Sequence, residues 1–293
     1  MVAYNHSIKF IPELEHNKKV ENLCSNVITV RENFSMMRLE DLEYRINFNN
    51  NQGRIITLYT DRVIARTVID QKWAFDVKDV VTFFWSSGEL SIDYLPGENF
   101  TPELLEYWTL QILLPLFLTS EEYFYFLHAG AVEINNAAIL FVAESYGGKS
   151  TITDFFIKKG HSLVSDDKVA ITEEDGVFLA IPSHSHHRPY RKVEDLGYYV
   201  TNMSSSPKTI HAIFVLHRVA SEISVSISEL EGIEKFKSLQ FSSEINLSFL
   251  KSQRFENLGD LAKNVAIFKV NVPWDIERLG DVYTAITKHC DLL

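Results

Sequence analysis

Residues 138–151 read A-I-L-F-V-A-E-S-Y-G-G-K-S-T, and the rest of the chain is best placed relative to this stretch. It opens with a short apolar run, residues 138–142, which has the length of a buried strand. Beyond the loop, apolar side chains recur at Ile152, Phe155 and Phe156, the spacing of one helix face. The stretch therefore predicts a strand, a glycine-containing loop and a helix, in that order.

A loop in this position that ends in Gly-Gly-Lys-Ser-Thr is typical of phosphate binding. Its backbone N–H groups, together with the positive end of the helix dipole, would bind phosphate oxygens. Lys149 would reach the β- and γ-phosphates of a nucleotide, and the Ser150 hydroxyl would hold Mg²⁺. The predicted nucleotide-binding residues of the loop are Ser145, Tyr146, Gly147, Gly148, Lys149, Ser150 and Thr151.

The loop departs from the pattern G-x-x-x-x-G-K-[ST] at its first position, where Ala143 replaces glycine. This change costs little if φ at Ala143 is negative. Tyr146 stands where many such loops have another glycine, and a left-handed backbone is expected to be costly for so large a residue. The alternative to a phosphate loop is an ordinary strand, turn and helix.

Two further segments flank this loop. Upstream, L-H-A-G-A-V places His128 beside an apolar strand, and downstream G-H-S-L-V-S-D-D-K-V ends a strand with Asp166 and Asp167. In this order and spacing, the three segments resemble the HPr kinase/phosphorylase family and its relatives, kinases that share a core with phosphoenolpyruvate carboxykinase. The resemblance covers residues 124–171 closely and the rest of the C-terminal half loosely.

The resemblance implies an α/β (α+β) fold with a P-loop core and a mixed sheet, and phosphoryl transfer that uses ATP and Mg²⁺. Adjacent residues of a strand face opposite sides, so one carboxylate can meet the metal while the other faces the acceptor hydroxyl. The family implies these roles for Asp166 and Asp167 as metal ligand and general base, without saying which residue has which role. It also places His128 beside the transferred phosphate.

A polar loop, P-S-H-S-H-H-R-P-Y-R-K at residues 182–192, follows further along the chain. Arginine forks bind phosphate oxygens in pairs, so Arg188 and Arg191 are predicted to contact the nucleotide or the acceptor. Zinc binding by the histidines is an alternative that lacks partners at ligand spacing, and a solvated loop is another. Glu194 and Asp195 are further candidates for a metal or acceptor contact.

The first hundred residues contain short β-like runs separated by turn signals, which predict a mostly antiparallel sheet. Residues 101–117 predict a helix with Thr101 as N-cap, Pro102 at the first helical position and a kink at Pro115. We therefore expect a mostly β N-terminal domain, residues 1–118, and an HPr kinase-like P-loop nucleotide-binding domain, residues 119–293.

Beyond the paired aspartates, the apolar patterns predict further elements of the second domain. The expected strands are 163–165, 168–172, 177–181, 210–217, 223–230 and 265–270, and the expected helices are 231–239, 243–251 and 276–287.

The composition is that of an ordinary globular protein, with 46% hydrophobic and 23% charged residues. A net charge of -11 without a basic stretch argues against nucleic acid as a partner. Residues 108–118 are apolar but too short for a membrane span. With two distant cysteines, Cys24 and Cys290, and no signal-peptide pattern at the start, the sequence predicts a cytoplasmic protein.

Together these features predict a kinase that transfers the γ-phosphoryl group of ATP to a hydroxyl of a peptide, a protein or a small metabolite. A catalytically inactive nucleotide-binding scaffold or sensor is the alternative. The identity of the acceptor, the use of ATP, ADP or pyrophosphate as donor, and homo-oligomer formation are left open by the sequence.

Overall fold

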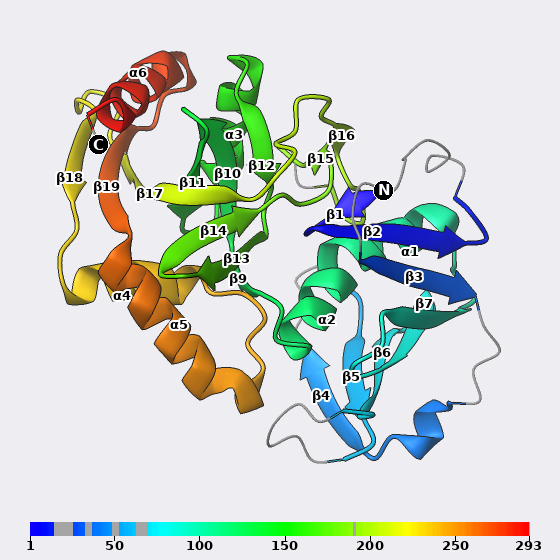
Figure 1. The fold of residues 1–293 in the computed structure, drawn as a ribbon. Helices are drawn as coiled ribbons and strands as arrows, with labels where there is room; N and C mark the ends of the chain where they lie inside the picture. Colours follow the sequence, from blue (N-terminus) through cyan, green and yellow to red (C-terminus); the bar gives the residue numbers. More distant parts are fainter. Residues whose placement is uncertain (15–25, 33–36, 49–52, 63–68, 190–191, 293) are drawn as a thin grey trace. The chain divides into compact units, whose positions relative to one another are not determined.

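The computed structural model describes residues 1–14, 26–32, 37–48, 53–62, 69–189 and 192–292 (Figure 1). These residues form two compact units. The first consists of residues 1–123 with 193–195, and the second of residues 124–192 with 196–293. The structure is of the mixed α/β type, with strands and helices in the second unit and mostly strands in the first.

The first unit is built on an eight-stranded sheet in the order β1-β2-β3-β8-β7-β6-β5-β4. The pairs β2/β3 and β3/β8 are parallel and the other strand pairs of this sheet are antiparallel, which confirms the mostly antiparallel prediction. The strands are β1 (Val2–Ala3), β2 (His6–Ile11), β3 (Val27–Glu32), β4 (Tyr44–Phe48), β5 (Ile56–Thr60), β6 (Lys72–Val77), β7 (Val81–Ser86) and β8 (Ser91–Pro96).

The helical segment of the first unit begins as predicted. In α1 (Pro102–Trp108), the Thr101 hydroxyl accepts a hydrogen bond from Leu104 N–H at 3.2 Å. A π-helical turn (Thr109–Leu113) joins α1 to α2 (Leu114–Ser120), and Pro115 follows it directly.

The second unit contains a nine-stranded mixed sheet, with the order β12-β10-β11-β17-β14-β13-β9 and with β19 and β18 continuing from β17. Its strands are β9 (Tyr125–Leu127), β10 (Ala129–Ile134), β11 (Ala137–Ala143), β12 (Ser162–Ser165), β13 (Val169–Glu174), β14 (Val177–Ile181), β17 (Lys208–Val219), β18 (Ser226–Glu229) and β19 (Ala266–Pro273). A separate short ribbon pairs β15 (His186–His187) with β16 (Tyr198–Tyr199).

Helices cover both faces of this sheet (Figure 1). Ile139 and Phe141 of β11 pack with α3 (Lys149–Lys158) and α6 (Leu279–Cys290). The alternate residues, Leu140 and Val142, belong to the core formed with α4 (Ile233–Ser242) and α5 (Lys251–Asn264). A strand buried on both faces reads as a continuous apolar run, which is why β11 is visible in the sequence. No helix in the described part of the chain is long and apolar enough to cross a membrane.

The predicted helix at 243–251 is wrong. The chain there forms only a short 3₁₀ turn (Ser248–Leu250), and α5 begins at Lys251. The buried face of α5 consists of Leu258, Leu261 and Ala262, spaced as one helix face.

The strand register brings three segments that are distant in the sequence to the same end of the strands. β10 runs antiparallel to both β11 and β12, with Ala129 opposite Val142 and Ala131 opposite Ser165. The start of β10 therefore lies beside the ends of β11 and β12. Because β17 and β19 run parallel to β11, their carboxyl ends face the same way, and such an edge is where α/β sheets bind ligands.

Candidate functional site

The glycine loop, residues 144–148, joins β11 to α3. Gly147 N–H donates to Glu144 O at 2.8 Å, and Gly148 is left-handed with φ 90°. Tyr146 is also left-handed, with φ 63°, so the loop adopts the conformation that is expected to be costly for this residue. Its side chain is 79% exposed and meets no crowding in the core, which leaves a backbone cost of about 1–2 kcal/mol.

The first turn of α3 presents backbone donors at the end of this loop. The first residue to bond within the helix is Ile152, whose N–H donates to Gly148 O at 2.9 Å. The N–H groups of Lys149, Ser150 and Thr151 precede that bond, and no side chain caps the helix. A helix start of this kind favours anions. Beside it lies a cavity of about 290 Å³ lined by Glu144, Tyr146, Gly147, Gly148, Lys149, Ser150, Thr151, Pro189 and Trp274.

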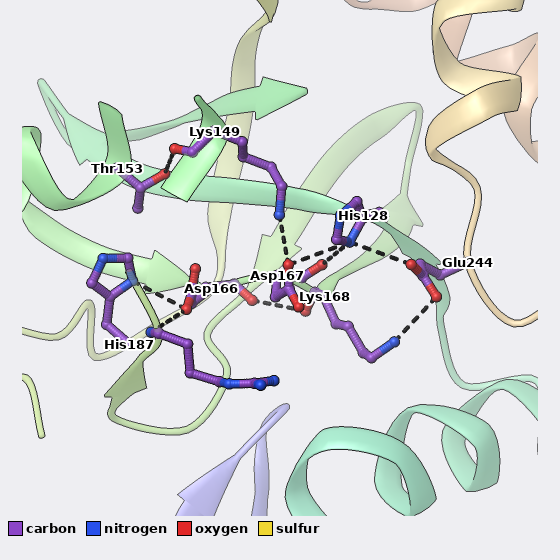
Figure 2. A network of polar contacts seen from close by, with 10 residues as sticks. His128, Lys149, Thr153, Asp166, Asp167, Lys168, His187 and Glu244 are labelled. Carbon is purple, nitrogen blue, oxygen red and sulfur yellow. Dashed lines mark hydrogen bonds and ion pairs between the residues drawn. The ribbon is translucent and has the colours of Figure 1, made fainter. Parts of the chain in front are cut away.

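The side chains of Lys149, Asp167 and His128 meet beside the first turn of α3 (Figure 2). The buried Lys149 Nζ donates to Asp167 Oδ1 at 2.7 Å, and His128 Nδ1 lies 3.4 Å from the same oxygen. Burial alone would raise the pKa of Asp167, but the Lys149 ammonium and His128 together outweigh it and hold this pKa well below its usual range. Burial, and then Lys149, lowers the pKa of His128. The sequence predicted all three residues, and the structure brings them together.

Glu244 and Lys168 complete this cluster and were missed by the sequence analysis. His128 Nδ1 lies 3.3 Å from Glu244 Oε1, and Lys168 Nζ lies 3.1 Å from Glu244 Oε2 (Figure 2). Glu244 follows α4, where Ser242 O accepts the His128 N–H at 2.6 Å. This backbone contact between distant segments positions Glu244, and no local motif signals it.

Asp166 points away from Asp167 into a separate buried network. Its Oδ2 accepts the Arg188 N–H at 2.7 Å. The same oxygen lies 3.1 Å from His187 Nδ1 (Figure 2). Burial would raise the pKa of Asp166, but its contact with His187 contributes to lowering it. The other ring nitrogen of His187 lies 3.7 Å from Asp154, which also accepts the Tyr198 hydroxyl at 2.6 Å.

The second carboxylate oxygen of Asp166, Oδ1, is buried and has no hydrogen-bond partner among the described residues. A buried carboxylate oxygen left unsatisfied by the protein is suited to a cation. The described residues contain no group of three or more His, Cys, Asp or Glu side chains that could hold a metal ion. Mg²⁺ does not need such a group, because it keeps several waters and binds through one or two carboxylates together with substrate phosphates.

Of the two arginines predicted to contact the nucleotide or the acceptor, only Arg188 belongs to the described residues. Arg188 is buried, and its Nη2 donates to Lys192 O at 2.9 Å, while Arg191 lies outside the described residues. Glu194 belongs to the first unit, where it accepts hydrogen bonds from Arg54 at 2.9 Å and from Trp108 Nε1 at 3.0 Å. Asp195 also belongs to the first unit.

His184 is expected to make the protein less stable in mild acid. Burial, and then His186, lowers its pKa to about 3, and its Nδ1 accepts the His186 N–H at 3.3 Å. In the unfolded chain the pKa is about 6.5, so between these values the unfolded state binds one proton more. The stabilisation is complete above about pH 6.5 and is lost as pH falls toward 3. At pH 5 the loss amounts to roughly 2 kcal/mol.

Urea unfolding at pH 7 and at pH 5 tests this expectation, with a His184→Asn variant that keeps an acceptor for the backbone N–H. The wild type should lose roughly 2 kcal/mol more than the variant between the two pH values. Equal losses would mean that His184 is protonated in the folded protein.

Comparisons with known proteins do not establish a family. No family model matches the chain, and no curated protein matches it. Among solved structures, the Hpr(Ser) kinase/phosphatase from Coxiella burnetii has a TM-score of 0.35 and 14% identity, over 56% of this chain and 95% of that one. A TM-score at this level supports no assignment, so function must be argued from the site itself.

Proposed function

We propose that the chain is an ATP- and Mg²⁺-dependent kinase that phosphorylates a hydroxyl group. The observation that carries the proposal is the ion pair between Lys149 and Asp167, 2.7 Å long, at the open start of α3. A lysine held by a carboxylate beside free backbone donors is a preformed site for the phosphates of a nucleotide. The Asp166 oxygen that has no hydrogen-bond partner in the described part of the chain adds a position for the metal ion.

In the proposed mechanism, the glycine loop and the first N–H groups of α3 hold the phosphate chain. The Lys149 ammonium, which can leave Asp167 when a stronger anion arrives, stabilises charge on the β- and γ-phosphates. Ser150 and Asp166 would hold Mg²⁺, which supplies charge neutralisation of the phosphates when bound.

We assign Asp167 as the general base, because Asp166 is committed to His187 and the Arg188 N–H. The acceptor oxygen attacks the γ-phosphorus as its proton passes to Asp167, and the bond from phosphorus to the β,γ-bridging oxygen breaks, releasing ADP. When the Lys149 ammonium moves to the phosphates, Asp167 loses its closest cation and its pKa rises toward a value useful for proton transfer. His128 stays beside the same oxygen and orients it.

The acceptor class follows from this chemistry: a serine of a peptide or protein, or a small hydroxylated metabolite. Incubation with γ-labelled ATP and Mg²⁺, against a library of serine peptides and a set of sugars and amino acids, tests the transfer. Transfer of label to a hydroxyl by the wild type, and its loss in Asp167→Asn, would support the kinase. Tight nucleotide binding without transfer to any acceptor and without hydrolysis would instead favour the nucleotide-binding scaffold.

A Gly147→Ala variant is expected to bind MgATP roughly tenfold to a hundredfold more weakly, by misplacing the loop. The added methyl group would lie 2.8 Å from Ala143 Cβ and 2.9 Å from Glu144 O, so the backbone must shift. Calorimetric titration measures the effect. The matched control is Gly259→Ala in α5, where the methyl group meets no atom within 4 Å. Wild-type affinity in Gly147→Ala would show that the loop does not hold the nucleotide.

A further inference from the structure

An apolar pocket of about 250 Å³ lies beside the glycine loop in the second unit. Ile152 and Leu216 line it from the core, and Pro273, Trp274 and Ile276 line it from the segment that begins at the end of β19. Trp274 and Ile276 are 52% and 75% exposed, so large apolar side chains are left open to solvent at a sheet edge. An open apolar pocket of this kind commonly marks a binding site.

The Trp274 ring is held in place although it is half exposed. Its backbone N–H donates to Val219 O at 2.9 Å, and the Arg218 guanidinium carbon lies 3.1 Å from the ring centroid. Arg218 also donates to Tyr146 O at 3.4 Å, which links the tryptophan to the glycine loop. The ring reaches Gly148 itself, since a methyl group there would lie 3.8 Å from it. A fixed aromatic ring beside a loop suits stacking, because little side-chain entropy is left to lose.

The two neighbouring cavities share one wall. Thr151 and Trp274 line both the apolar pocket and the cavity at the start of α3, whereas Lys149 and Ser150 line only the latter. A lysine in this type of loop reaches the β- and γ-phosphates, and the backbone donors hold the α- and β-phosphates. The nucleoside is therefore expected on a side of the phosphate site that Lys149 does not line, and the apolar pocket meets this condition.

We propose that this pocket binds the nucleobase of the nucleotide, with the base stacked on Trp274. The inference rests on the proposed nucleotide-dependent function and adds to it the site that distinguishes a nucleotide from other polyphosphates. Every base has a π-face, so aromatic stacking accepts any base. The pocket should therefore distinguish nucleotides from base-free polyphosphates more strongly than it distinguishes one base from another.

The test is calorimetric titration of the full chain with MgATP and with magnesium tripolyphosphate, which has the phosphates and no base. In Trp274→Ala, MgATP should bind at least about tenfold more weakly, while tripolyphosphate should bind within about twofold of the wild type. Trp274→Phe should recover most of the ATP affinity, because it retains an aromatic face. Phe255→Ala, which removes an exposed ring from α5, is the control and should change neither ligand.

Unchanged tripolyphosphate binding in Trp274→Ala also shows that the loop is still folded. If the wild type binds ATP and tripolyphosphate equally, or if Trp274→Ala binds ATP as the wild type does, the base pocket is refuted and the phosphate site remains. If the wild type binds neither ligand, both the base pocket and the proposed function are refuted.

Discussion

Lys149→Met is expected to lower phosphoryl transfer roughly a thousandfold, because it removes a lysine charge placed at the glycine loop and the start of α3. Lys149 Nζ is buried and lies 2.7 Å from Asp167 Oδ1, so its position is fixed before a nucleotide arrives. Transfer of label from ATP to the acceptor, compared as kcat/KM for MgATP, measures the loss. Lys263→Met, an exposed lysine on α5, is the control and should keep full activity.

Loss of Lys149 also leaves the Asp167 carboxylate without its closest cation, and breaking a buried pair is costly. A lower melting temperature in Lys149→Met is therefore expected, and folding must be checked by circular dichroism. Lys149→Arg keeps the charge and removes this complication. If both variants are folded and transfer phosphate at the wild-type rate, Lys149 has no part in the reaction.

Asp167→Asn is expected to lower turnover by about 10²- to 10⁴-fold while MgATP binding stays within about threefold of the wild type. The amide oxygen of asparagine can still accept the Lys149 hydrogen bond, but it cannot take a proton from the acceptor hydroxyl. Measuring the dissociation constant and turnover separately distinguishes a base from a residue that only positions Lys149.

Asp166→Asn gives the opposite pattern. Replacing the Asp166 carboxylate with an amide weakens the proposed magnesium contact, so Mg²⁺ should strengthen ATP binding less in this variant than in the wild type. Asp260→Asn, at an exposed position of α5, controls for the loss of a negative charge. If Asp166→Asn loses turnover without any loss of magnesium dependence and Asp167→Asn stays active, the two roles are the reverse of our assignment.

Much of the site could be predicted from local sequence because its elements are local. The strand, loop and helix around Lys149 follow from an apolar run, two glycines and a helical apolar spacing. β11 has nearly the predicted limits, and α3 contains the three apolar residues that predicted a helix. The meeting of His128 with Asp167 follows from β10 lying between β11 and β12, a strand order that the sequence did not predict.

The remaining contacts depend on tertiary packing. Glu244, which follows α4, lies beside His128. His187 lies between Asp166 and Asp154, and these three residues come from three separate segments of the chain. The sequence indicated a histidine-rich loop but not which ring would be buried. The sequence did not single out Trp274, and only the structure places its ring against Gly148.

The most direct test of the central claim is isothermal titration of the purified chain with ATP, with and without Mg²⁺, beside Lys149→Arg and Lys149→Met. We predict that the wild type binds ATP, that Mg²⁺ strengthens the binding, and that Lys149→Met loses it. Absence of binding to the wild type at millimolar ATP with Mg²⁺ would contradict both the kinase and the nucleotide-binding scaffold.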